Sequence, residues 1–200
     1  VVAGIGSQVL TNVIDNSEEQ LVGTEMAQLT TAMKRFRRDT GYWPHQGIFA
    51  ADDAANATNP ANFTQLFVEP ATGGVAIMAF DVSTGSGWNG PYVTEYNSVS
   101  VTVGASLAVD GTGSPAAGAV TTVRGVGDPF AAAPVGNLLL WTTASGDTPQ
   151  LGRPVLYFVS AAAEANVANC TAPCLVSLGP DGAYGAGGDD DIVVNLGALN

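Results

Sequence analysis

The chain has 200 residues, of which only 12% are charged, and its 18 acidic and 6 basic residues give a formal net charge of −12. A surface this acidic repels phosphate backbones, and the sequence shows no basic groove interleaved with aromatic residues, so nucleic-acid binding is not expected. The length suits one domain, or one domain with a large insertion, and no run of 18 apolar residues indicates a membrane span.

Apolar residues in the N-terminal segment recur at helical spacing. They are Val22, Met26, Leu29, Met33 and Phe36. This spacing keeps them on one face of an α-helix and off any single face of a strand. The stripe is too narrow for a helix that is buried on all sides, so we expect the helix to lie across another element, for which a sheet is the natural choice.

Both ends of this helix carry local signals. Ser17 and Gln20 have the spacing of a capping box, which places a helix start near Ser17. At the other end, the basic residues between 34 and 38 favour the negative end of the helix dipole. Gly41 suits the left-handed position after the last turn, and Pro44 prevents the helix from continuing.

The segment after the helix offers little catalytic chemistry. We expect residues 45–62 to form an irregular loop, and 63–68 fits a short helix or a short strand equally. His45, the only histidine, is expected to be an exposed turn residue, and no nucleophile elbow, P-loop or zinc-protease motif occurs. Trp88 and Tyr92 stand in a glycine-rich loop, where we expect them to pack onto the domain.

Several short strands are predicted in the second half of the chain. Val99, Val101 and Val103 alternate with polar residues, as in a half-buried strand. Further strands are expected at 120–124, 135–141, 154–160, 174–178 and 192–196, with 135–141 and 154–160 joined as an antiparallel hairpin. One long helix followed by hairpin-like strands predicts an α+β fold with an antiparallel sheet.

Two cysteines and an acidic loop close the sequence. Cys170 and Cys174 match neither the redox spacing nor a zinc site; they would form a disulfide in an oxidising compartment or remain free thiols in a cytosolic protein. The glycine-rich loop that follows carries Asp181 and the run 189–191. Ca²⁺ binds six to eight oxygen atoms and would compensate these charges, whereas the simpler alternative is a solvated acidic turn.

Five segments in order resemble the type IV pilin superfamily, and most closely the major pseudopilins of type II secretion systems. The segments are Arg-Asp-Thr-Gly-Tyr-Trp-Pro (38–44), Gly-Trp-Asn-Gly-Pro-Tyr (87–92), Asp-Pro-Phe (128–130), Gly-Arg-Pro-Val-Leu-Tyr (152–157) and Leu-Val-Ser-Leu-Gly-Pro-Asp-Gly (175–182), the last followed by Asp-Asp-Asp-Ile. In that family an N-terminal helix ends at a similar turn, and the chain closes with an acidic calcium loop.

The resemblance implies a pilin-like fold and a calcium site. A long helix in residues 1–44 would pack on an antiparallel sheet, and residues 45–200 would form a globular head whose middle, about 94–150, is enlarged. The implied Ca²⁺ ligands are Ser177, Leu178, Asp181, Asp189, Asp190 and Asp191. The Cys170–Cys174 bridge would then rigidify the approach to the loop.

The resemblance also implies a structural role. The chain would be a non-enzymatic subunit of a pseudopilus or pilus-like filament, periplasmic or extracellular, with itself and other pilin-like subunits as partners. The family's hydrophobic N-terminal half-helix anchors subunits in the inner membrane before assembly, whereas residues 1–10 here carry only an apolar remnant without the family's glutamate. That difference and the enlarged middle separate this sequence from the usual major pseudopilin.

Two other functions stay open. A minor pilin or adhesin at a filament tip could use the enlarged middle to bind a ligand. A secreted, calcium-stabilised carbohydrate-active enzyme could use paired carboxylates such as Asp52 and Asp53, although a solvated loop is the more common setting for such residues.

Overall fold

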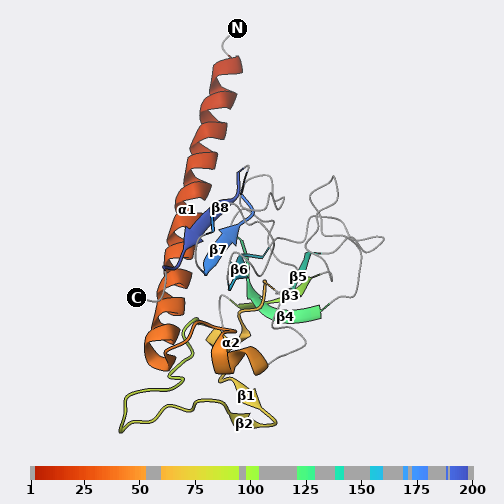
Figure 1. Ribbon diagram of the computed structural model, residues 1–200. Helices are drawn as coiled ribbons and strands as arrows, with labels where there is room; N and C mark the ends of the chain where they lie inside the picture. The colour runs from red at the N-terminus through yellow and green to blue at the C-terminus, as the bar shows by residue number, and fades with distance from the viewer. Residues whose placement is uncertain are drawn as a thin grey trace.

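The fold is α+β, with one long helix, α1 (Ala3–Thr40), lying along a sheet formed by the C-terminal half of the chain (Figure 1). This computed structural model describes residues 3–52, 60–94, 98–103, 121–128, 138–141, 154–159, 169–170, 173–179, 188 and 190–197. Side chains between 3 and 19 are not among the features described. The predicted α+β class is therefore confirmed at this level.

Short elements follow the long helix. They are η1 (Gly47–Ala51), α2 (Thr64–Phe67), β1 (Ala71–Thr72), β2 (Val75–Ala76), β3 (Ser98–Val103), β4 (Thr121–Val126), β5 (Leu138–Trp141), β6 (Leu156–Phe158), β7 (Cys174–Ser177) and β8 (Ile192–Asn195). The segment 63–68, for which the sequence fits a helix or a strand equally, contains the short helix α2. The irregular loop predicted over 45–62 contains the 3₁₀ turn η1. The remaining strand predictions each find a strand at or near the expected place.

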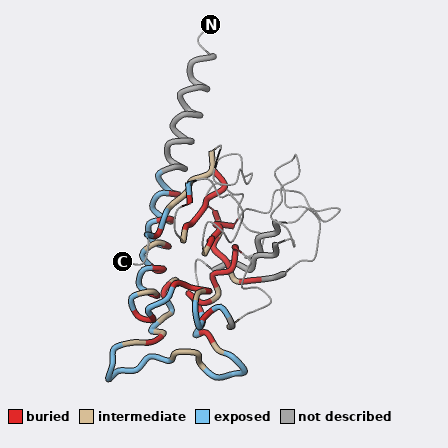
Figure 2. Tube along the Cα trace, in the orientation of Figure 1, coloured by how far each residue is buried: buried red, intermediate tan, exposed pale blue. Residues whose placement is uncertain are grey.

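The predicted apolar face of α1 forms the centre of the core. All five of its members are at most 4% exposed: Val22, Met26, Leu29, Met33 and Phe36. Figure 2 shows that buried positions on the helix alternate with exposed ones, as expected for a helix that covers one side of a sheet. No helix in the described part is apolar over a long enough stretch to cross a membrane.

The predicted helix start is wrong, whereas the predicted end is confirmed. The helix is already formed at Ala3 and runs through Ser17 without interruption, because apolar residues at a spacing of four, such as Val9 and Val13, continue the helical pattern upstream. At the other end, Gly41 has φ +81°, and its N–H donates to the carbonyl of Arg37 at 2.7 Å. This is the left-handed cap that glycine favours.

In the described part of the head, two three-stranded sheets accompany the two-stranded sheet of β1 and β2. In one, β7 lies between β6 and β8, and both pairs are antiparallel. In the other, β3 pairs antiparallel with β4 and parallel with β5. The Val155 N–H donates to the Val126 carbonyl at 2.9 Å and joins the chain before β6 to the end of β4. β5 and β6 thus lie in different sheets, and the predicted hairpin between 135–141 and 154–160 is wrong.

Aromatic side chains fasten the end of the helix to the neighbouring loops. The ring centroid of Phe36 lies 5.1 Å from that of Phe49 and 5.5 Å from that of Tyr92, with both pairs edge to face. Trp88 stacks edge to face on Tyr92 and donates its indole N–H to the Gln65 carbonyl at 2.8 Å. The predicted packing of Trp88 and Tyr92 onto the domain is confirmed.

His45 is buried, which corrects the prediction that it is an exposed turn residue. Only 6% of it is accessible, and its backbone has φ +59°. Its N–H donates to the side-chain oxygen of Gln65 at 2.8 Å, and its Nε2 lies 3.0 Å from the carbonyl oxygen of Asn62. These partners come from a segment about twenty residues away, which the local turn pattern does not reveal.

Candidate metal centre

The two ends of the acidic loop meet at one end of the β7–β8 pair. The antiparallel register places Ser177 opposite Ile192, so the residues that follow Ser177 and those that precede Ile192 lie at the same edge of the sheet. Four of the six predicted ligands fall in the described part of the chain: Ser177, Leu178, Asp190 and Asp191. Asp181 and Asp189 lie outside it.

On the β7 side of the loop, Ser177 and Leu178 are fully buried. The Leu178 N–H donates to Oδ2 of Asp128 at 2.7 Å, and the Gly179 N–H donates to Oγ of Ser177 at 3.4 Å. Because the Leu178 side chain belongs to the core, Leu178 could serve a cation only through its backbone carbonyl. Ser177 could contribute its hydroxyl oxygen.

Gly179 brings the two sides of the loop into contact. It has φ +63°, and a Cβ atom at this position would collide with the backbone carbonyl of Asp190. On the β8 side, the Asp191 N–H donates to the Gly188 carbonyl at 3.1 Å, which closes a turn just before the strand. The chain leaving β7 and the chain entering β8 therefore touch, and only glycine fits at the point of contact.

The donor atoms at this edge are of the kind that Ca²⁺ prefers. Asp190 and Asp191 are half-buried, and one carboxylate oxygen of each, Oδ1, is shielded from solvent. Ser177 would add a hydroxyl oxygen and Leu178 a carbonyl oxygen, and oxygen donors of these kinds suit a hard cation. Within the described ranges, no three Asp, Glu, His or Cys residues converge, so a full coordination sphere would need Asp181 or Asp189 as well.

Two acidic residues, Asp128 and Glu25, were not predicted as functional. Asp128 is 4% exposed and holds the Leu178 N–H, as described above. Burial raises the pKa of the Glu25 carboxyl on α1 above its ordinary 4.5, and the negative charge of Asp128 raises it further. In the sequence, Asp128 is notable only as part of the Asp-Pro-Phe segment, and Glu25 is a single acidic residue next to the apolar stripe of α1, which is a weak signal.

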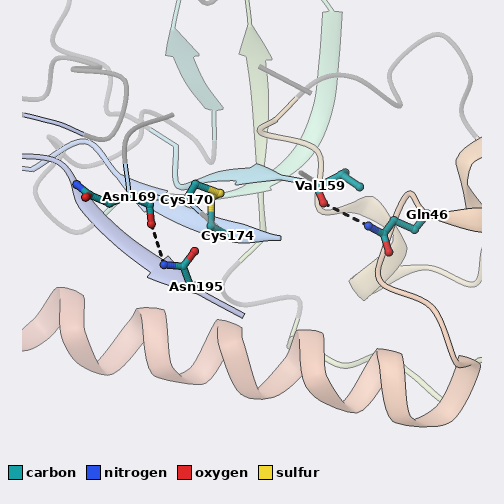
Figure 3. The surroundings of a disulfide bond; sticks show 6 residues. All are labelled: Gln46, Val159, Asn169, Cys170, Cys174 and Asn195. Carbon is teal, nitrogen blue, oxygen red and sulfur yellow. Dashed lines mark hydrogen bonds between the residues drawn. A yellow bond between two sulfur atoms is a disulfide. The ribbon is translucent and has the colours of Figure 1, made fainter. Parts of the chain in front are cut away.

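The disulfide between Cys170 and Cys174 is present, as predicted (Figure 3). Cys174 is the first residue of β7, so the bridge closes a small loop at the opposite end of that strand from Ser177. The side-chain amide of Asn195, at the end of β8, donates to the Asn169 carbonyl at 2.8 Å. The disulfide loop is therefore fastened to both β7 and β8, the two strands between which the acidic loop runs.

No protein-family model, no curated protein and no solved structure matches the chain. Any assignment of function therefore depends on the residues and their arrangement. That arrangement is an acidic, glycine-rich loop whose two ends meet at one edge of a sheet. A disulfide closes a small loop at the other end of β7, and a long helix lies along the sheet.

Proposed function

We propose that the chain is a structural subunit of a pilin-like filament, such as a type II secretion pseudopilus, and that Ca²⁺ holds its C-terminal loop. The observation that carries the proposal is the β7–β8 register, which joins both sides of the acidic loop beside the long helix. The resemblance of five ordered segments to the pilin superfamily supplies the identity of the filament. The role is mechanical rather than enzymatic.

The shape of the molecule supports a role in assembly. α1 has 38 residues, and its N-terminal turns extend beyond the head (Figure 1). At about 1.5 Å per residue the helix is about 57 Å long. A rod that outreaches its own head can contact heads of neighbouring copies, as a filament subunit in the periplasm or outside the cell would require.

The ion would act as a clamp between the two sides of the loop. The residues that would hold it are Asp181, Asp190, Ser177 through an oxygen atom and Leu178 through its backbone carbonyl, with Asp189 or Asp191 completing the set. When bound, Ca²⁺ supplies two positive charges that offset the repulsion among the aspartates. Since the ion binds the folded loop, binding adds to the stability of the head.

Calorimetric titration of the chain, stripped of metal by a chelator, tests the calcium site. We expect one Ca²⁺ per chain, and we expect Asp190→Ala or Asp181→Ala to abolish binding because each removes a charged ligand. Asp81→Ala is the matched control, since Asp81 is exposed and lies in a separate loop, where it accepts hydrogen bonds from Ser83. Binding that survives in both test variants, or fails in wild type, contradicts the proposal.

A binding role at a filament tip is the second candidate. Exposed apolar side chains stand on the segment after α2: Val75 in β2 is 72% exposed, and Phe80 and Val82 beyond it are 38% and 86% exposed. Such side chains are available for contact with a ligand. A filament-forming assay with a complete pilin-type hydrophobic segment joined before Val1 separates the two functions, because a major subunit polymerises alone and a tip protein does not.

A further inference from the structure

A basic hollow lies beside the C-terminal end of α1. It has a volume of about 310 Å³ and is lined by Lys34, Arg37, Arg38, Trp43 and Leu196. The guanidinium of Arg37 lies 4.8 Å from the centre of the Trp43 ring, which is the geometry of a cation–π contact. Arg and Trp are over-represented among the residues that contribute most to protein–protein binding.

Positive charge is concentrated in this hollow. Four of the six basic residues of the chain lie between Lys34 and Arg38, and three of these four line the hollow. Arg38 donates from Nε to Oδ1 of Asp39 at 2.9 Å, but its side chain is still 69% exposed and can reach a second anion. In a chain with a net charge of −12, the hollow is where an acidic partner is attracted most strongly.

The aromatic wall of the hollow has an unused hydrogen-bond donor. Trp43 is 1% exposed, and its Nε1–H meets no acceptor in the part of the chain that the structure describes. A buried indole N–H ordinarily has an acceptor, and leaving it without one is unfavourable.

The hollow and the acidic loop lie at opposite ends of one strand. Asp190 and Asp191 immediately precede β8, and Leu196, which lines the hollow, immediately follows it. The start of β8 therefore carries negative charge, and the end of β8 lies beside positive charge. Complementary surfaces at different places on the same molecule produce a head-to-tail contact, which repeats into an open filament unless it closes into a ring.

We infer that the basic hollow receives the acidic loop of a second copy of this chain. The inference rests on the proposed function, since a filament subunit must contact its own kind. Two copies that each carry a charge of −12 repel each other at most of their surface, whereas a contact through the hollow pairs opposite charges. Lys34, Arg37 and Arg38 supply the attraction, and the buried Trp43 ring supports the guanidinium of Arg37.

Sedimentation velocity at increasing protein concentration tests this contact, at about 20 mM and about 300 mM NaCl, because salt screens attraction between exposed charges. We expect wild type to associate at low salt and to dissociate at high salt. Lys34→Gln should weaken association about two- to fivefold, the range for one exposed ion pair. Arg35→Gln is the matched control, since it removes the same charge from an exposed position outside the hollow.

Two outcomes would overturn the inference: a chain that stays monomeric under all these conditions, or equal weakening by Arg35→Gln and Lys34→Gln. Titration with a tetra-aspartate peptide tests whether the hollow binds acidic chains in general. If the peptide binds through Lys34 but the chain does not self-associate, the partner is a different acidic protein and the inference is wrong. Calorimetry keeps the two proposals apart. A chain that binds Ca²⁺ but does not associate overturns only the contact, and one that associates through the hollow without binding Ca²⁺ overturns only the calcium site.

Discussion

The two sides of the acidic loop can touch only because residue 179 is a glycine. Its φ of +63° disfavours any other residue, and a Cβ there would also collide with the Asp190 carbonyl. We expect Gly179→Ala to lower the free energy of unfolding by about 2–4 kcal/mol, from backbone strain and overpacking together. Gly73→Ala is the matched control, since it has φ +60° but open space around it, and it should lose only about 1 kcal/mol. Equal losses in urea unfolding would refute the close contact.

Glu25 is expected to make the head less stable as pH rises. Its pKa in the folded chain is raised above 4.5 by burial and by Asp128, so between the two pKa values the folded state holds more protons than the unfolded state. The free energy of unfolding therefore falls as pH rises through that window and stays lower above it. Glu25→Gln should be more stable than wild type at about pH 7, and this advantage should vanish below about pH 4.

Urea unfolding of both proteins across this pH range, in the presence of a chelator, measures the difference. The chelator matters because Asp128, whose charge acts on Glu25, also accepts a hydrogen bond from the Leu178 N–H at the start of the acidic loop. Tyr92, which lines the same small cavity as Glu25, has a pKa raised to about 12 by burial and does not titrate here. A Gln variant that is less stable than wild type at neutral pH would contradict the prediction.

At the scale of single residues, the sequence predicted those features that depend only on neighbouring residues in the chain. Gly41 was placed correctly because a left-handed cap leaves a local signature. His45 was misplaced because its burial depends on Gln65 and Asn62, which reach it from another segment. The role of Asp128 depends on Leu178, which is 50 residues away, and the pKa of Glu25 depends on Asp128, which is about a hundred residues away. No local pattern encodes such interactions.

At the scale of elements, α1 owes its position to its buried face rather than to its length. Phe36 is fully buried against Phe49 and Tyr92, whereas Leu21 on the same helix is 52% exposed. Phe36→Ala should cost about 3–5 kcal/mol because it removes aromatic contacts and leaves a cavity. Leu21→Ala should cost less than about 1 kcal/mol. Similar losses for both in chemical denaturation would show that the helix does not depend on this face.

The elements themselves were largely predictable, but their partners were not. The alternation of Val99, Val101 and Val103 identified β3, yet nothing in that pattern distinguishes a neighbour in sequence from a distant one. β5 lies parallel to β3 rather than antiparallel to β6, because pairing depends on how the whole sheet is assembled. The false start near Ser17 has a related cause, since a capping-box spacing also occurs inside helices.

At the scale of the whole molecule, the acidic loop and the basic hollow lie at opposite ends of a strand that runs beside the long helix. β8 carries the acidic loop at one end and leads to the basic hollow at the other, and α1 runs beside it (Figure 1). The sequence could predict that an acidic loop and a basic helix end exist. It could not predict that the strand after the acidic loop ends beside the basic helix end, since that depends on how Leu196 packs against α1.

The central claim is that Ca²⁺ stabilises the head by clamping the acidic loop, and thermal unfolding of the whole chain with and without the ion tests it most directly. At a Ca²⁺ concentration about 100 times the dissociation constant, binding adds about 2.7 kcal/mol. For a chain of this length we expect the melting temperature to rise by about 5–10 °C, with a chelator reversing the change. A melting temperature that is the same in saturating Ca²⁺ and in chelator would contradict the account.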